Sequence, residues 1–209
     1  MGGRGLSGTR WGILGGTFDP VHCAHLAVAE QVRDALSLSG VLFVPARVPV
    51  HKPGVVVSPA EHRLAMLELA VAGNPAFALS HLELDRSTPS YSVETLEQLT
   101  AERPDDEFVF ILSVEAAGLL HTWHRPQQLL ELCRLAVVPR LGYEALDDDY
   151  VPTHFPGQAA RFLSVATSRL GHSASDIRTR VAAGQTIRYL VPSAVEDYIK
   201  EHALYRADD

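Results

Sequence analysis

The chain has 209 residues, of which 46% are hydrophobic and 21% charged, a composition typical of a globular protein and unlike that of a disordered chain. Its net charge of −7 argues against a nucleic-acid-binding surface, which needs an excess of lysine and arginine. A small phosphorylated ligand remains compatible, because a pocket can be locally positive in an acidic protein.

Membrane insertion and secretion are not expected. No apolar run approaches the roughly 18–20 residues that span a bilayer, and the opening MGGRGLSGTR lacks the apolar core of a signal peptide. The two cysteines, Cys23 and Cys133, lie far apart in unrelated contexts and predict no disulfide framework. We therefore expect a cytoplasmic protein with no membrane partner.

Short apolar runs alternate with helix-like segments along the chain. The runs predict strands at residues 11–14, 41–44, 77–82, 108–112, 135–138 and 162–165. They are almost continuously hydrophobic, as expected of parallel strands that are covered on both faces. The alternation predicts an α/β fold: a Rossmann-like, doubly wound parallel sheet of five to six strands with helices on both faces.

Three helix ends can be predicted from the sequence. Ser58 to Glu61 resembles a capping box with proline at the first helical position, and Gly73 would close that helix. Ser173 offers an N-cap to a helix that would stop at Gly184. Pro192 can open a last helix that runs to about residue 202.

The most informative stretch is GGTFDPVHCAHL, residues 15–26, directly after the first predicted strand. Glycines at a strand end let backbone amides approach an anion, and a helix N-terminus favours negative charge. His22 and His25, three residues apart, lie on one face of the first helical turn. The segment therefore predicts a phosphate site at the carboxyl end of the sheet, where ligands bind in such folds.

A tight turn, a zinc site or a standard nucleotide motif would each account for less of this stretch. Gly15-Gly16 alone could be only a tight turn. Two histidines could contribute to a zinc site, but such a site needs three or four ligands, and Cys23 lies on a different face. The stretch matches neither the dinucleotide fingerprint G-x-G-x-x-G nor the P-loop. We predict no metal bound by protein side chains.

Four later segments could supply further contacts. Lys52, in a proline-stiffened loop, could reach phosphates as a flexible point charge. Hydroxyls and free amides of residues 87–92 could hold a carboxylate or phosphate, and Trp123-His124 could sandwich a flat heterocycle. Residues 173–178 bring serines, helix amides and Arg178 toward an anion. Each segment taken alone could equally be a solvated loop, a helix cap or a core anchor.

Together these segments resemble the nucleotidyltransferase superfamily marked by an (H/T)-x-G-H motif, and within it the bacterial nicotinate-nucleotide adenylyltransferases. The likeness runs from residue 10 to residue 205. It rests on GGTFDP with the two histidines, VPVHK (48–52), HRLAM (62–66), PSYSVETL (89–96), the Trp123 region, VVPRLGY (137–143), SASDIR (173–178) and YLVPSAVEDYI (189–199).

The resemblance implies transfer of AMP from ATP to nicotinate mononucleotide, with release of pyrophosphate, in NAD biosynthesis. It implies a catalytic set of His22, His25, Lys52 and Arg178. It implies an ATP-binding set of Gly15, Gly16, Thr17, Phe18, Arg140 and Ser175. Tyr91, Ser92, Glu115, Trp123 and His124 would bind nicotinate mononucleotide, with Glu115 at its ribose and the others around its nicotinate end.

Magnesium carried by ATP is the expected cofactor, by analogy with other phosphoryl-transfer sites. We expect one nucleotidyltransferase domain over residues 1–209, with a flexible extension at 1–10 and a helical part at 173–209 that completes the phosphate site. A homo-oligomer is compatible with the sequence.

The chain departs from the family pattern at four places. Ala24 stands where the family has glycine, Ser113-Val114-Glu115 replaces Gly-x-Asp, Leu141 replaces proline, and Ala174 replaces a serine. None removes a charged phosphate ligand. The remaining alternatives are an adenylyltransferase acting on nicotinamide mononucleotide or phosphopantetheine, and a non-catalytic nucleotide-binding module that has kept the fold.

Overall fold

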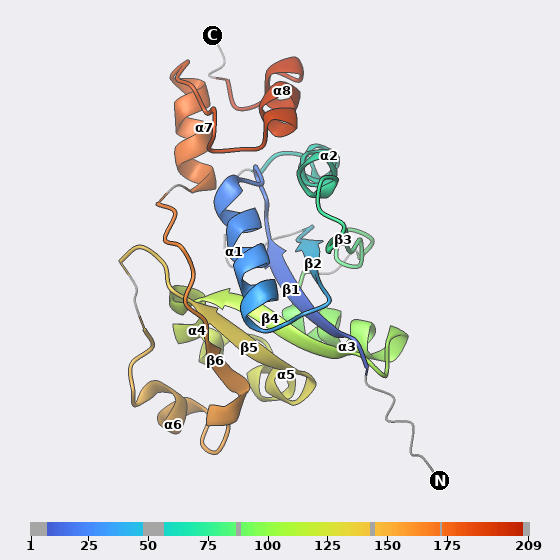
Figure 1. The fold of residues 1–209 in the computed structure, drawn as a ribbon, viewed down its shortest axis with the longest axis vertical. Helices are drawn as coiled ribbons and strands as arrows, with labels where there is room; N and C mark the ends of the chain where they lie inside the picture. The colour runs from blue at the N-terminus through green and yellow to red at the C-terminus, as the bar shows by residue number, and fades with distance from the viewer. Residues whose placement is uncertain (1–7, 48–56, 87–88, 143–144, 172, 207–209) are drawn as a thin grey trace.

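The computed structural model describes residues 8–47, 57–86, 89–142, 145–171 and 173–206. Its centre is a six-stranded sheet in the order β3-β2-β1-β4-β5-β6 with every neighbouring pair parallel (Figure 1). The strands are β1 (Arg10–Gly16), β2 (Gly40–Pro45), β3 (Phe77–Leu79), β4 (Glu107–Ser113), β5 (Cys133–Val138) and β6 (Phe162–Ser164). The predicted α/β doubly wound sheet is confirmed, and each predicted strand is present.

The connections between strands are helical. The α-helices are α1 (Cys23–Ala35), α2 (Ala60–Val71), α3 (Ser92–Glu102), α4 (Val114–Gly118), α5 (Pro126–Leu132), α6 (Tyr150–His154), α7 (Ala174–Ala182) and α8 (Ser193–Glu201). Short 3-10 turns lie at η1 (Leu120–Thr122) and η2 (Ala159–Arg161). Among the described helices, none is long and apolar enough to cross a bilayer.

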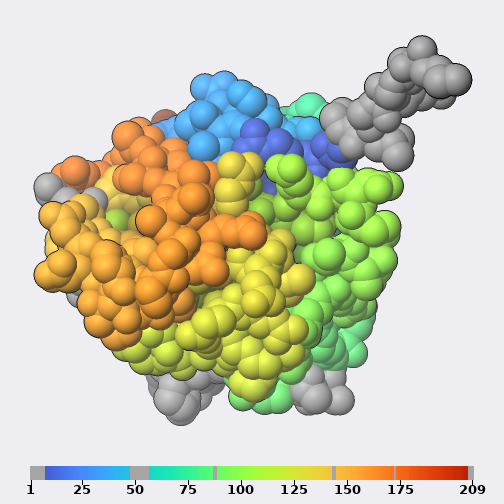
Figure 2. All heavy atoms as spheres, turned by 90° about the horizontal axis from the view of Figure 1, so that it is seen from below, coloured from blue at the N-terminus to red at the C-terminus, as the bar shows by residue number. Residues whose placement is uncertain are grey.

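Alternate strand residues supply two hydrophobic cores, one on each face of the sheet. In β2, Val41 and Phe43 belong to one core, whereas Leu42 and Val44 belong to the other. The first core packs against α1, α2, α7 and α8, and the second against α3, α4 and α5. In Figure 2 the blue segment of α1 and the green and yellow segments of α3 to α5 lie on opposite sides of the molecule. This is why both alternating sets of residues in the central strands are largely apolar.

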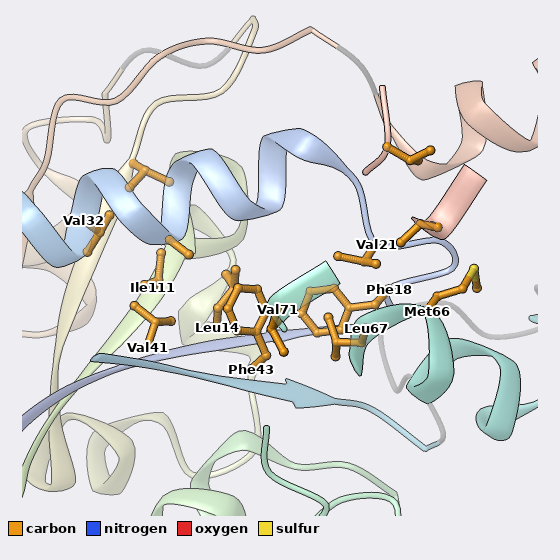
Figure 3. Close-up of a cluster of buried hydrophobic side chains, with 14 of the residues drawn as sticks. Leu14, Phe18, Val21, Val32, Val41, Phe43, Met66, Leu67, Val71 and Ile111 are labelled. Carbon is orange, nitrogen blue, oxygen red and sulfur yellow. The ribbon is translucent and has the colours of Figure 1, made fainter. Parts of the chain in front are cut away.

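The loop after β1 is part of the first core. Phe18 and Val21 are buried there with Met66 and Leu67 of α2 and Phe43 of β2 (Figure 3). Burial of the large side chains fixes the path of the loop between β1 and α1. The second half of the loop, residues 18–22, is therefore buried.

The other strands differ from their predicted bounds by at most two residues, but the predicted end of β3 and the predicted cap of α2 are wrong. β3 ends at Leu79, three residues before the predicted end at 82, because the chain turns there and Ser80 Oγ accepts a hydrogen bond from the Leu82 N–H at 3.4 Å. Ser58 does not cap α2, since the N-cap is Pro59 and makes no side-chain cap bond. The backbone of Ser58 instead bonds to Asp19 and Arg63.

The other predicted helix ends are confirmed. Ser173 accepts a hydrogen bond from the Asp176 N–H at 3.2 Å and caps α7, and Gly184 follows that helix with φ +65°. Pro192 is the N-cap of α8, whose C-cap is His202. In Figure 1 both helices lie at the same end of the molecule, and α8 packs against α2.

Candidate active site

A cavity of about 570 Å³ lies at the carboxyl ends of the central strands. β1 and β4 are neighbours in the sheet although β2 and β3 lie between them in the sequence. The strand order therefore reverses between β1 and β4, and this switch point is where ligands bind in such folds. Predicted site residues from separate segments line it: Gly15, Gly16, Thr17, Phe18, His22, His25, Ser92, Trp123, Arg140, Ser175 and Arg178. The sheet therefore brings most of the sequence-predicted set to one place.

The two histidines lie against each other at the start of α1. His22 is the N-cap residue and is 6% exposed, and the ring centroids of His22 and His25 are 3.6 Å apart with nearly parallel planes. The His22 N–H donates to His25 Nδ1 at 3.2 Å. Because Nδ1 accepts, a neutral His25 carries its proton on Nε2. His25 is thus a hydrogen-bond donor through Nε2.

The two glycines of the motif differ in their surroundings. A Cβ on Gly16 would lie 3.1 Å from the Phe18 ring, whereas a Cβ on Gly15 would make an ordinary 3.5 Å contact with Phe110. Phe18 has φ +51°, which is unusual for a non-glycine residue and is maintained here by burial. Gly16 therefore has a packing reason in addition to its predicted place in the nucleotide loop.

Arg178 is held at the cavity by the loop after β1. Its Nη1 donates to the Asp19 carbonyl at 2.7 Å and its Nη2 to Ser175 Oγ at 3.3 Å. Arg178 and Ser175 both lie on the first turns of α7, where the helix N-terminus favours an anion. The predicted cation and hydroxyl thus converge at one end of the cavity.

Asp19 is a cavity residue that the sequence analysis missed. It is 2% exposed, and its carboxylate accepts hydrogen bonds from the Tyr205 hydroxyl at 2.7 Å and the Ser58 N–H at 3.1 Å. Burial and the neighbouring Asp19 carboxylate raise the pKa of the Tyr205 phenol, which therefore remains a donor at neutral pH. The aspartate of GGTFDP is thus a structural link between the site and the C-terminal residues.

A second cavity of about 240 Å³ adjoins the first, and Ser90, Ser92 and Trp123 line both. Tyr91 and His124 also line it, with ring centroids 4.5 Å apart. Trp123 packs against Phe110 and His124 packs against Tyr91, and both line this second cavity. The sandwich of a flat ring between Trp123 and His124 stays a prediction. A flat ligand can lie against Trp123 beside the Tyr91–His124 pair.

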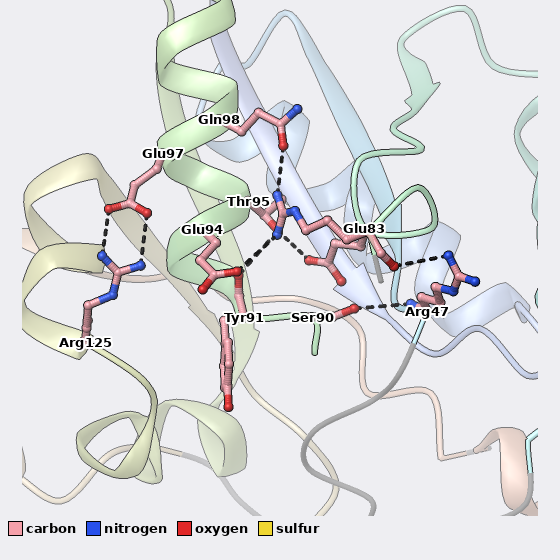
Figure 4. Close-up of polar contacts among 10 residues, drawn as sticks. Arg47, Glu83, Ser90, Tyr91, Glu94, Thr95, Glu97, Gln98 and Arg125 are labelled. Atoms are coloured by element: carbon pink, nitrogen blue, oxygen red, sulfur yellow. Dashed lines mark hydrogen bonds and ion pairs between the residues drawn. The ribbon is translucent and has the colours of Figure 1, made fainter. Parts of the chain in front are cut away.

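A buried polar cluster supports the start of α3 (Figure 4). Thr95 Oγ1 donates to Glu83 Oε1 at 2.8 Å and accepts from Arg86 Nη1 at 3.2 Å. Ser90 Oγ accepts the Arg47 N–H at 3.2 Å. On the other side of α3, Glu97 forms a bidentate pair with Arg125, at 2.9 and 3.0 Å, before α5.

Glu83 lines the main cavity, is 6% exposed and was also missed. Burial raises the pKa of its carboxyl, and the Thr95 hydrogen bond only partly opposes this effect. The only sequence signal for Glu83 was an acidic residue near a strand end, which is too common to be informative. Its burial depends on the fold of residues 80–95.

Glu115 lines neither of the two cavities and instead forms an ion pair with Arg140, which lines the main one. Its predicted contact with the ribose of nicotinate mononucleotide stays a prediction. Lys52, predicted to reach the phosphates, lies outside the described residues.

The four departures from the family pattern all lie near the main cavity. Ala24 and Ala174 line it, and Leu141, 68% exposed, lines it where it opens to solvent. Ser113 accepts a hydrogen bond from the Ala116 N–H and caps α4, directly before Glu115. Ala24, Ser113, Leu141 and Ala174 therefore all lie in the wall of the cavity, and none of the four is charged.

Glu83 predicts a pH effect on stability. Since burial raises its pKa above the ordinary 4.5, the native state holds this proton more tightly than the unfolded chain. The Glu83 contribution to the free energy of unfolding should therefore decrease as pH rises from the unfolded pKa through the raised native pKa. Glu83→Gln keeps an oxygen acceptor for Thr95 and cannot ionise, so it should lack this decrease.

Thermal unfolding of both proteins between about pH 4 and about pH 8 measures this effect. The Tm of Glu83→Gln should rise relative to that of the wild type as pH increases. A Tm difference that stays constant over the whole range would contradict the assignment.

The chain is similar to known proteins over nearly its whole length. A cytidylyltransferase-like family model matches residues 13–180. The Thermomicrobium roseum protein named "Probable nicotinate-nucleotide adenylyltransferase" is 46% identical over 198 residues, which cover 95% of this chain and 92% of that protein. The protein of the same name from Geobacillus thermodenitrificans is 46% identical over 196 residues, 94% of this chain and 86% of that protein.

A solved structure supports the fold. Plasmodium falciparum nicotinic acid mononucleotide adenylyltransferase complexed with NaAD has a TM-score of 0.77 at 18% identity and covers 94% of this chain and 97% of its own. The two bacterial relatives match nearly the full length of this chain, including the segments that line the cavity. The chain therefore belongs to the nicotinate-nucleotide adenylyltransferase family of nucleotidyltransferases.

Proposed function

We propose that this chain transfers the adenylyl group of ATP to nicotinate mononucleotide, forming nicotinate adenine dinucleotide and pyrophosphate, with the described cavity as the reaction site. One observation carries the proposal: His22, His25 and Arg178 line a single cavity from two segments that are more than 150 residues apart in sequence. An aromatic-lined cavity adjoins it and offers a place for the acceptor.

The chemistry requires alignment of two anions more than covalent help. The phosphate of the acceptor is already ionised, so no base is needed to activate it. Holding the reactants in line can contribute about 7–11 kcal/mol, and fixed donors stabilise charge that develops on the leaving pyrophosphate. We assign this charge stabilisation to His22, His25, Lys52 and Arg178.

The two ends of the substrates would occupy different parts of the site. The loop of residues 15–18 and the start of α7 would hold the ATP phosphates, because both offer backbone amides and Arg178 adds a charge. Each helix end contributes only about 0.3–1 kcal/mol at an exposed site, so two ends and several cations are needed. The nicotinate ring would lie at Trp123, where free amides near Ser92 can receive its carboxylate.

A magnesium ion fits this site only as a partner of the nucleotide. Among the described residues that line the main cavity, the carboxylates are those of Asp19 and Glu83. Both already accept hydrogen bonds from protein groups. We therefore propose that phosphate oxygens of ATP hold the ion, which would neutralise phosphate charge when bound.

We further propose that residues 1–209 act as one domain in the cytoplasm, without a nucleic-acid partner. The single domain is supported by Ser175 and Arg178 of α7, which line the same cavity as β1. The location is supported by the free thiols of Cys23 and Cys133. The net charge of −7 argues against a nucleic-acid surface.

Pyrophosphate release from ATP tests the function. We expect release with nicotinate mononucleotide and much less with nicotinamide mononucleotide, because an amide needs an acceptor where a carboxylate needs only donors. Preferred use of nicotinamide mononucleotide or phosphopantetheine would reassign the substrate. Release with none of the three acceptors would indicate a nucleotide-binding module without this activity.

His25→Ala should lower kcat by about a hundredfold or more, the usual effect of removing one donor to a developing charge. Steady-state kinetics and circular dichroism would show the loss together with an intact fold. His154→Ala, a histidine on α6 outside both cavities, is the matched control and should keep wild-type kcat. Unchanged turnover in His25→Ala would remove this histidine from the mechanism.

Arg178→Ala should lower kcat/KM for ATP at least about tenfold, since a hydrogen bond to a charged group contributes about 1.5–3 kcal/mol. The KM for nicotinate mononucleotide should change much less. Arg180→Ala is the control on the same helix, because Arg180 does not line the cavity. Its Nε donates instead to the Thr186 carbonyl at 2.9 Å. A larger effect on the acceptor than on ATP would reverse the assignment of this end of the cavity.

A further inference from the structure

Arg63 of α2 is a fully buried cation that donates to four main-chain carbonyls. It is 1% exposed. Its Nη1 donates to the carbonyls of Thr17 at 2.8 Å and Ala46 at 2.7 Å, its Nε to that of Ser58 at 3.0 Å, and its Nη2 to that of Arg47 at 3.4 Å. Burial lowers the pKa of the guanidinium, and nearby Asp19 opposes this effect.

These carbonyls belong to three separate segments around the main cavity. Thr17 follows β1, Ala46 and Arg47 follow β2, and Ser58 precedes α2. Thr17 and Ala46 line the cavity, as does Val57 next to Ser58, whereas Arg63 does not. Arg63 therefore lies behind the cavity wall and bonds to the backbone that forms it.

The hydrogen bonds from Arg63 also orient the peptide groups whose carbonyls they contact. In a trans peptide the carbonyl and the following N–H point in opposite directions. The Ala46 carbonyl accepts from Arg63, and the N–H of the same peptide, that of Arg47, donates to Ser90 Oγ at 3.2 Å. One peptide thus links Arg63 to the segment that begins α3 and lines both cavities.

The peptide between Thr17 and Phe18 follows the same rule. Its carbonyl accepts from Arg63, so the N–H of Phe18 points away from the guanidinium. Phe18 has φ +51°, a conformation that persists only when surrounding contacts over-determine it. The Arg63 bond is one such contact on the loop assigned to ATP.

Arg47 extends the link beyond Ser90. Its Nη1 donates to the carbonyls of Leu84 at 3.0 Å and Arg86 at 3.2 Å, so its side chain holds the segment after β3 while its backbone carbonyl bonds to Arg63 (Figure 4). A continuous set of hydrogen bonds therefore runs from the loop after β1, through Arg63 and Arg47, to the start of α3.

We propose that Arg63 is a positioning residue. It holds the loop of residues 15–18, assigned to ATP, and the segment of residues 90–92, assigned to the acceptor, at a fixed separation for adenylyl transfer; this rests on the proposed function. A guanidinium suits the task because its five donors form a rigid fork, whereas an ammonium offers three donors at one point. Misplacement of reacting groups by about 1 Å can cost about a hundredfold in rate. The proposal concerns geometry, since Arg63 does not line the cavity.

The test compares Arg63→Lys, which keeps the charge and loses the fork, with Arg63→Gln, which loses both. Wild-type turnover of ATP and nicotinate mononucleotide is measured first, because its absence would refute the proposed function independently of Arg63. In both variants kcat should fall at least about tenfold, while each KM changes less than about threefold. Assays run well below each Tm, so that the protein is folded.

Two controls separate positioning from general stability. Arg33→Lys makes the same chemical change in an arginine that pairs with Glu30 on α1, and Val71→Ala lowers stability from the other end of α2. Both should keep wild-type kcat when folded. A tenfold loss confined to the Arg63 variants supports the proposal.

Three results would overturn it. Arg63→Lys with wild-type kcat would show that the fork is not required. Loss of kcat in Val71→Ala, equal to that in the Arg63 variants, would reduce the effect to instability. Failure of both Arg63 variants to fold even in the cold would assign Arg63 to fold stability alone.

Discussion

Parallel pairing of β1 with both β2 and β4 is the constraint on which the site depends. The register runs from Trp11 opposite Gly40 to Gly16 opposite Pro45 on one side, and from Arg10 opposite Glu107 on the other. All three strands therefore end at one edge, and the connections that follow β1 and β4 leave it on opposite faces. The space between them is where the histidines, the helix ends and the aromatic residues can meet.

That edge exposes backbone groups which need partners once the loops are buried. Two side chains supply several of these partners around the loop after β1. Asp19 accepts from Tyr205 and from the backbone of Ser58, and Arg63 donates to carbonyls of three segments. The Asp19 carboxylate and the Arg63 guanidinium thus hydrogen-bond to residues far apart in sequence. They connect the loop after β1 to α2 and to the C-terminal residues.

Local patterns in the sequence were enough to predict the sheet, and most of the predicted site residues line the main cavity. Continuous apolar runs identify buried parallel strands. In the GGTFDP segment, the glycines and the two histidines that predict a phosphate site all lie within twelve consecutive residues. Asp19, Arg63 and Glu83 could not be predicted in their observed roles, because those roles depend on how separate segments pack together: Tyr205 is 186 positions from Asp19, and Thr17 is 46 positions from Arg63. Ser58 is likewise not the predicted cap, because Pro59 takes the N-cap position of α2 and the backbone of Ser58 bonds to Asp19 and Arg63.

In the histidine pair, a backbone hydrogen bond determines which ring nitrogen of His25 can donate. The His22 N–H donates to Nδ1 of His25, and the His22 ring stacks on the His25 ring with centroids 3.6 Å apart. With Nδ1 occupied as an acceptor, Nε2 is the ring nitrogen of His25 that can donate. Under the proposed function, this Nε2–H is the His25 donor to charge that develops on a phosphate oxygen, and its direction is set by the backbone at the start of α1.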